Sequence, residues 1–226
     1  MKQLPPGLPV PVVEPIDPAS SEFYRVLFSS MERRMGEKPV KSIAVTSAVK
    51  GEGKTTTAIQ LARVSARDFG KRILLMEGDL KNPQFHRYWT KTEEIGLYHV
   101  LTQQASLDQA IHPTDVEGLE VMPLGTAAMA GAVNASLLAQ GFRGVVQAAS
   151  GRYDYVVVDS PPVLPLVDMR IIAEAVDGVV MVIQADGPPR SLVAKALEAI
   201  PREKVLGVVF NGVTTIWPRY TYGYTY

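Results

Sequence analysis

Short apolar runs alternate with longer segments of helical period along this chain. The runs are four to six residues long, which predicts strands, and they span residues 42–46, 73–76, 155–158, 178–183 and 205–210. Helical periodicity fills the stretch from Thr55 to Gly70 and returns over 138–149 and 193–200. Strand–helix–strand units form right-handed crossovers, so we predict an α/β fold. It is a doubly wound, mostly parallel sheet flanked by helices, with ligands at the carboxyl ends of its strands.

The two ends of the chain differ from this pattern. Six prolines within residues 1–18 disfavour helix and central strand, so residues 1–17 are predicted to be an extended, Pro-rich leader. A helix is predicted from Pro18, with an apolar stripe that packs on the core, formed by Phe23, Val26, Leu27 and Met31. We expect one domain over 18–213 and a separate, Tyr-rich tail over 214–226.

A phosphate-binding loop is predicted between the first strand and the next helix. Its residues are Gly51, Glu52, Gly53, Lys54, Thr55 and Thr56, although Ala48 replaces the first glycine of the full pattern. Glycines let main-chain N–H groups curl around anionic oxygens at a helix N-terminus. Lys54 then reaches the outer phosphates, and the Thr55 hydroxyl binds magnesium. A plain glycine turn is the alternative, and it explains less of the pattern.

Carboxylates follow two other predicted strands. Asp159 comes directly after residues 155–158, while Glu77 and Asp79 come after 73–76. At the tips of neighbouring strands they should face the phosphate loop, where Asp159 and Asp79 would hold magnesium with Thr55. Glu77 and Asp79 would also position or deprotonate an attacking hydroxyl. A helix cap or turn former is the alternative for any one of them, but two strand tips beside a phosphate loop favour function.

Composition excludes several other classes of function. Lys plus Arg and Asp plus Glu number 23 each, so no overall field favours nucleic acid, and we expect no nucleic-acid partner. Absence of cysteine excludes disulfides and thiolate chemistry, and the histidines at 86, 99 and 112 are scattered. No apolar run approaches the roughly 18 residues of a membrane helix. We therefore expect a cytoplasmic protein that reaches the inner face of the plasma membrane only through a partner.

These motifs resemble those of the bacterial tyrosine kinases, the autokinase modules of capsule and exopolysaccharide export, which are related to the MinD and ParA ATPases. Residues 50–55 are similar to Walker A, 74–83 to Walker A′ and 156–162 to Walker B. The resemblance covers most of the chain from Pro18 onward and implies ATP and Mg²⁺ as cofactors. It also implies that Asn211, after the last strand, reads the adenine, although a polar strand-ending residue is an equal alternative.

The C-terminal cluster Tyr220, Tyr222, Tyr224 and Tyr226 strengthens the resemblance, because this family phosphorylates such clusters in trans. An alternating edge strand and a disordered end are the other interpretations. The family implies ATP- and Mg-dependent tyrosine autophosphorylation that regulates polysaccharide polymerisation and export. It implies self-association and an activator, a membrane-spanning chain-length regulator, which we expect on a separate polypeptide.

Departures from the family pattern leave alternatives open. Glu77 stands where the family has aspartate, and Lys81 where it has arginine. The family's oligomerisation motif is matched by Glu22 and Arg25 but not by Phe28, which weakens the expectation of ring assembly. The alternatives are a nucleotide-binding regulator of the same export system with weak or no kinase activity, and a MinD- or ParA-type ATPase. Val49, at the position of that branch's signature lysine, argues against the latter.

Overall fold

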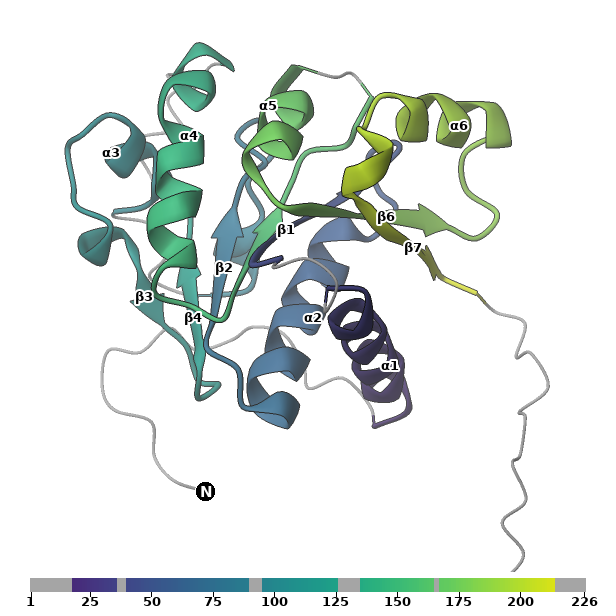
Figure 1. The fold of residues 1–226 in the computed structure, drawn as a ribbon, viewed down its shortest axis with the longest axis horizontal. Helices are drawn as coiled ribbons and strands as arrows, with labels where there is room; N and C mark the ends of the chain where they lie inside the picture. Colours follow the sequence, from purple (N-terminus) through teal and green to yellow (C-terminus); the bar gives the residue numbers. More distant parts are fainter. Residues whose placement is uncertain (1–17, 36–39, 90–94, 126–134, 165–166, 214–226) are drawn as a thin grey trace, which may run out of the picture.

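The computed structural model describes residues 18–35, 40–89, 95–125, 135–164 and 167–213 (Figure 1). The predicted leader over 1–17 and the tyrosine cluster at 220–226 lie outside the described residues. Within the described part, all predicted strands and helices are present with bounds within a few residues of expectation. The predicted α/β class is confirmed.

One sheet of seven strands forms the centre of the described chain, in the order β3-β4-β2-β5-β1-β6-β7. All neighbouring strands are parallel except β3 and β4, which are antiparallel. β1 and β2 are buried along their whole length, as expected for strands covered on both faces. The strands are β1 (Ser42–Ser47), β2 (Ile73–Glu77), β3 (His112–Pro113), β4 (Leu119–Met122), β5 (Tyr155–Asp159), β6 (Gly178–Gln184) and β7 (Val205–Asn211).

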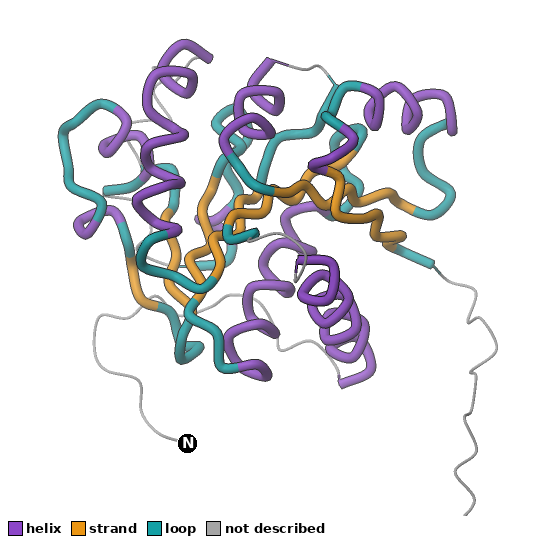
Figure 2. Tube along the Cα trace, in the orientation of Figure 1, coloured by secondary structure: helices purple, strands orange, loops and turns teal. Residues whose placement is uncertain are grey.

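Helices cover both faces of this sheet, which is the orange layer of Figure 2. Figure 1 shows α1 and α2 on one face and α4, α5 and α6 on the other, with α3 beside α4. Each face has its own apolar core. The helices are α1 (Pro18–Met35), α2 (Lys54–Phe69), α3 (Leu97–Leu101), α4 (Ala135–Ser150), α5 (Val167–Ala175) and α6 (Arg190–Glu198), with short 3₁₀ turns η1 (Phe85–Arg87), η2 (Asp108–Ala110) and η4 (Arg202–Lys204).

The core face of α1 differs from the predicted stripe. Phe23 and Val26 are 76% and 57% exposed, so their assignment to the core was wrong, whereas Met31 is buried. Phe28 is buried as well, with its ring 4.7 Å from that of Phe69 and edge-on to Tyr155 at 5.5 Å. The helix therefore turns a different side to the core, and the residue that departs from the oligomerisation motif is a packing residue.

The parallel strands bring the predicted site residues to one edge of the sheet. β2, β5, β1 and β6 lie side by side in one direction, so their carboxyl ends meet at one edge of the sheet. The loop into α2 and the residues after β2 and β5 start from that edge. Among the described helices, none has the length and apolar character that a bilayer crossing requires.

Candidate active site

The loop between β1 and α2 has the backbone of a phosphate-binding loop. Gly51 and Gly53 adopt φ angles of +95° and +88°, which residues other than glycine rarely adopt. Gly53 is also the N-cap of α2, and the Thr57 N–H donates to its carbonyl at 2.9 Å. A Cβ at Gly53 would lie 2.1 Å from Nδ2 of Asn211. The loop thus presents the N-terminus of a sixteen-residue helix to an anion.

Glu52 braces this loop through its side chain, a role that the sequence did not indicate. It is 1% exposed, and its Oε2 accepts the Val49 N–H at 2.8 Å while Oε1 accepts the Gln184 N–H at 3.1 Å. Its carbonyl accepts a hydrogen bond from Asn211 Nδ2 at 3.0 Å. Glu52 therefore ties the loop to β6 and β7, and Asn211, the last residue of β7, lies beside the loop.

Lys54 is at the centre of the polar cluster. It is 6% exposed, and its Nζ lies 2.9 Å from Asp79 Oδ2 and 3.6 Å from Asp159 Oδ1. Thr55, next in α2, donates its hydroxyl to Asp159 Oδ2 at 2.8 Å. The structure thus brings together four of the predicted residues from three separate segments, as their positions at the strand tips implied.

Asp159 has a strongly perturbed carboxyl group. Burial raises the pKa of its carboxyl from 3.8 to about 7, against the opposing attraction of Lys54 and the hydrogen bond from Thr55. Its Oδ1 is buried and has no hydrogen-bond partner among the described residues. A buried carboxylate oxygen without a donor, beside a threonine hydroxyl, has the chemistry of a magnesium ligand.

Magnesium would have to share this site with phosphate. No three His, Asp or Glu side chains converge on a ready-made metal site in the described part of the chain. The residues fit the ion in the manner of a phosphate-loop protein, in which Thr55 and Asp159 would hold it while the nucleotide supplies further oxygens. Asp79 Oδ2, also predicted as a metal ligand, is paired with Lys54 instead.

Glu77 is placed differently from its neighbour Asp79. It is 2% exposed, and its oxygens accept the main-chain N–H groups of Gln84, Phe85 and Leu124. Burial raises its pKa, and these three hydrogen bonds oppose the rise. Its contacts therefore do not favour the expected role of positioning or deprotonating a tyrosine.

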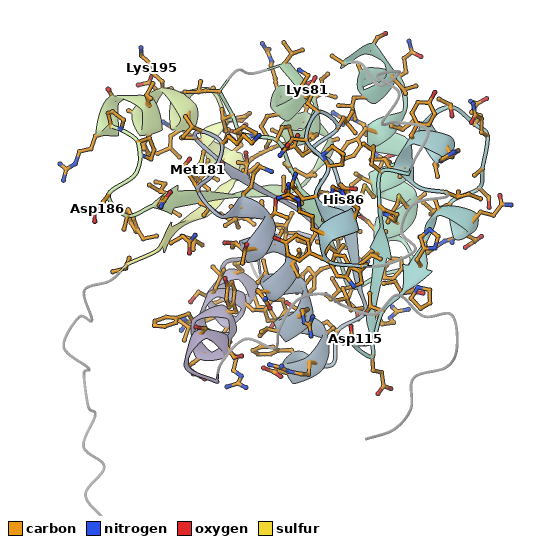
Figure 3. The ribbon with its side chains drawn as sticks, turned by 180° about the vertical axis from the view of Figure 1, so that it is seen from behind. Lys81, His86, Asp115, Met181, Asp186 and Lys195 are labelled. Carbon is orange, nitrogen blue, oxygen red and sulfur yellow. The ribbon has the colours of Figure 1, made fainter. Side chains whose placement is uncertain are left out.

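The segment after β2 closes over one side of the cluster. Gly78 donates its N–H to the Asp159 carbonyl at 2.7 Å, and Asn82 donates its N–H to Asp79 Oδ1 at 3.2 Å. Lys81, labelled in Figure 3, forms an ion pair of 2.7 Å with Asp168 at the start of α5. Lys81 thereby keeps the cationic character of the position and links the segment to α5.

Comparisons with known proteins agree with this geometry. A family model described as an AAA domain matches residues 40–198. The tyrosine-protein kinase YwqD of Bacillus subtilis (strain 168) is 34% identical over 195 residues, which are 85% of this chain and 81% of that protein. The succinoglycan biosynthesis transport protein ExoP of Rhizobium meliloti (strain 1021) is 30% identical, over 84% of this chain but 25% of its own length.

A solved structure gives the same answer for the fold. The BceF tyrosine kinase domain superimposes with a TM-score of 0.74 at 29% identity and covers 86% of this chain and 78% of that one. The residues matched by the family model include the phosphate loop and both acidic strand tips. The chain therefore belongs to the bacterial tyrosine kinase family of P-loop ATPases.

Proposed function

We propose that this protein is an ATP- and Mg²⁺-dependent protein-tyrosine autokinase whose acceptors are Tyr220, Tyr222, Tyr224 and Tyr226 of another copy of the chain. The observation that carries the proposal is the placement of Lys54 between Asp79 and Asp159 beside the phosphate loop. Family membership supports the same activity, since relatives such as YwqD are named tyrosine-protein kinases.

Each residue of the cluster has a distinct task. Main-chain N–H groups of 51–56 bind the phosphates, and Lys54 exchanges its carboxylate partners for phosphate oxygens. Asp79, released by Lys54, is then free to accept a proton. Thr55 and Asp159 hold the magnesium, which when bound neutralises charge on the phosphates. Asn211, beside Gly53, contacts the base.

The transfer itself needs only positioning and one proton acceptor. The tyrosine Oη attacks the γ-phosphorus, the bond from that phosphorus to the β–γ bridging oxygen breaks, and ADP leaves. The hydroxyl proton passes to Asp79. Lys54 stays on the transferred group, where its charge stabilises the transition state.

We further propose that the reaction regulates exopolysaccharide or capsule export at the inner face of the plasma membrane. ExoP, named as a transport protein of succinoglycan biosynthesis, matches nearly the whole of this chain with a quarter of its length. A cytoplasmic protein of this family would be recruited and activated by a membrane-spanning chain-length regulator. Self-association would bring one copy's tyrosines to another copy's phosphate loop.

A mixing experiment tests the activity and its direction. Purified protein is incubated with ATP and magnesium, with the activator's cytoplasmic segment added in a parallel reaction, and probed for phosphotyrosine. Lys54→Met abolishes the signal, and so does replacing the four acceptor tyrosines with phenylalanine. Mixing these two variants restores phosphotyrosine on the Lys54→Met chain if transfer is in trans.

Two results would favour the alternatives. Phosphate release to water at a normal rate without phosphotyrosine points to a MinD- or ParA-type ATPase. Tight nucleotide binding with neither product, even with the activator segment present, points to a regulator that signals by its bound state.

A further inference from the structure

Glu77 joins three parts of the fold with one carboxylate. It is the last residue of β2, and its Oε1 accepts the N–H groups of Gln84 at 2.5 Å and Phe85 at 2.7 Å. Its Oε2 accepts the Leu124 N–H at 2.8 Å. Residues 84 and 85 begin η1, and Leu124 follows β4. Both oxygens are therefore engaged by main-chain donors from segments that are far apart in the sequence.

The Leu124 side of this junction also anchors α3. The Leu124 carbonyl accepts the Tyr98 N–H at 3.0 Å, and the Pro123 carbonyl accepts the Leu97 N–H at 2.8 Å. Gly96, before α3, lies so close that a Cβ there would be 2.2 Å from the Pro123 carbonyl oxygen. The chain after β4 is thus packed tightly against the start of α3, which makes it a rigid point of attachment for Glu77.

The Gln84 side of the junction closes the segment that carries Asp79. That segment is fixed at its start, where Gly78 donates to the Asp159 carbonyl, and at its end, where Glu77 holds residues 84 and 85. Asp79 lies between these two points with Oδ2 on Lys54 Nζ. Besides these two points, the segment is held by the contacts of Asp79 and the Lys81 ion pair. The Lys50–Asn82 hydrogen bond and the buried side chains of Leu80 and Phe85 add to them.

We propose that Glu77 is a positioning residue, which fixes the segment 78–85 so that the Asp79 carboxylate stays beside Lys54 and the phosphate loop. The inference deepens the proposed kinase activity and depends on it only for the turnover measurement. We assign Glu77 no proton transfer, because its oxygens are directed at the main-chain N–H groups of residues 84, 85 and 124. The extra methylene relative to aspartate is what lets one carboxylate span both segments.

Two substitutions separate positioning from proton transfer. Glu77→Gln keeps one acceptor oxygen but turns an NH₂ toward an N–H donor, so one of the two attachments is lost. Glu77→Asp keeps the charge but shortens the reach. We expect either variant to lower kcat about 10- to 100-fold, the scale of a misplacement near 1 Å. The nucleotide Kd should stay within about threefold, because the phosphate loop is unchanged.

Amide hydrogen exchange measures directly whether the three main-chain hydrogen bonds to Glu77 are formed. In the wild-type protein the N–H groups of Gln84, Phe85 and Leu124 should be protected although they lie outside the strand ladders, and Glu77→Gln should expose those on one side. Asp79→Asn is the contrast, because it should lower kcat while leaving these three amides protected. Glu120→Gln, which weakens the bond from the Tyr153 hydroxyl to β4, is a matched control that should change neither.

Distinct results overturn the proposal. Unprotected amides in the wild-type protein, or full turnover in Glu77→Asp, contradict the positioning role. If Glu77→Gln abolishes turnover while all three amides stay protected, and Glu77→Asp shifts the acid limb of the pH profile of kcat, Glu77 is itself the base. If the wild-type protein forms no phosphotyrosine, the proposed function fails. The positioning role of Glu77 is then tested by amide exchange and by the rate of phosphate release instead.

Discussion

Replacing Asp159 with asparagine should stabilise the nucleotide-free protein while destroying its site. Asparagine has the size of aspartate and can still accept the Thr55 hydroxyl hydrogen bond, but it cannot ionise. A folded-state pKa of about 7 against an ordinary 3.8 means that the buried charge is disfavoured on folding. At pH 8 the unfolding free energy of Asp159→Asn should therefore exceed that of the wild-type protein by about 4 kcal/mol.

The pH dependence fixes the sign of this effect. Because the folded-state pKa is raised, the contribution of Asp159 to stability is fully present below pH 4 and is lost as the pH rises through about 7. The advantage of Asp159→Asn should therefore shrink to about 2 kcal/mol at pH 5 and vanish near pH 3.5. Urea unfolding of both proteins at several pH values measures it.

Ligand binding should reduce the advantage of Asp159→Asn at pH 8 from about 4 to about 1 kcal/mol. Magnesium with a non-hydrolysable ATP analogue at 100 times its Kd adds about 2.7 kcal/mol to the wild-type protein, and the variant should gain little of this.

Asp154→Asn is the control, with an expected effect of opposite sign. Two hydrogen bonds from Arg72 lower the pKa of the Asp154 carboxyl, the larger effect coming from the main-chain N–H and the smaller from the guanidinium. Asp154→Asn should therefore lose stability at pH 8. An Asp159→Asn protein no more stable than wild type at pH 8, or an advantage that does not change between pH 8 and pH 5, would refute the reasoning.

Four further substitutions test other parts of the fold and site. Lys54→Met should reduce phosphotyrosine to background and weaken binding of a fluorescent nucleotide, because the cation that faces the phosphates is gone. Gly53→Ala should abolish nucleotide binding by clashing with Asn211, and adding Asn211→Ala should recover only part of it, because the positive φ still strains alanine. Asn211→Ala alone removes one hydrogen bond and should weaken nucleotide binding roughly fivefold in a titration. Phe28→Ala should lower the unfolding free energy by about 3–5 kcal/mol in urea titrations, since its ring is buried in the core between α1, α2 and β5.

The sequence predicted the centre of the fold well for a physical reason. Four of the five predicted strands, β1, β2, β5 and β6, are apolar runs because both faces of the sheet are covered there, and such runs are recognisable without tertiary information. The fifth, β7, lies at the edge of the sheet and exposes Val208 and Phe210. Gly70 ends α2 with φ +62°, as its position after the last apolar residue indicated. β3, of two residues, and β4, of four, are too short for a periodic signal.

Helix orientation was less predictable than helix position. Leu27 packs partly against the core, and Phe28 and Met31 are buried, so the core side of α1 passes through 27, 28 and 31. The sequence also offers Phe23 and Val26 at helical spacing, and both stripes satisfy the period. Only the position of α2 and β5 decides between them, and that is tertiary information.

Glu77 and Asp79 show the same limit within the site. In a continuing strand, residues two apart point to one face, which led to the expectation that both carboxylates enter the crevice. β2 instead ends at Glu77, and the Gly78 N–H already bonds to the Asp159 carbonyl, so strand alternation stops before Asp79. One carboxylate then turns to main-chain donors and the other to Lys54. Spacing alone could place both groups at the strand tip, but only the main-chain donors of residues 84, 85 and 124 give Glu77 contacts that differ from those of Asp79.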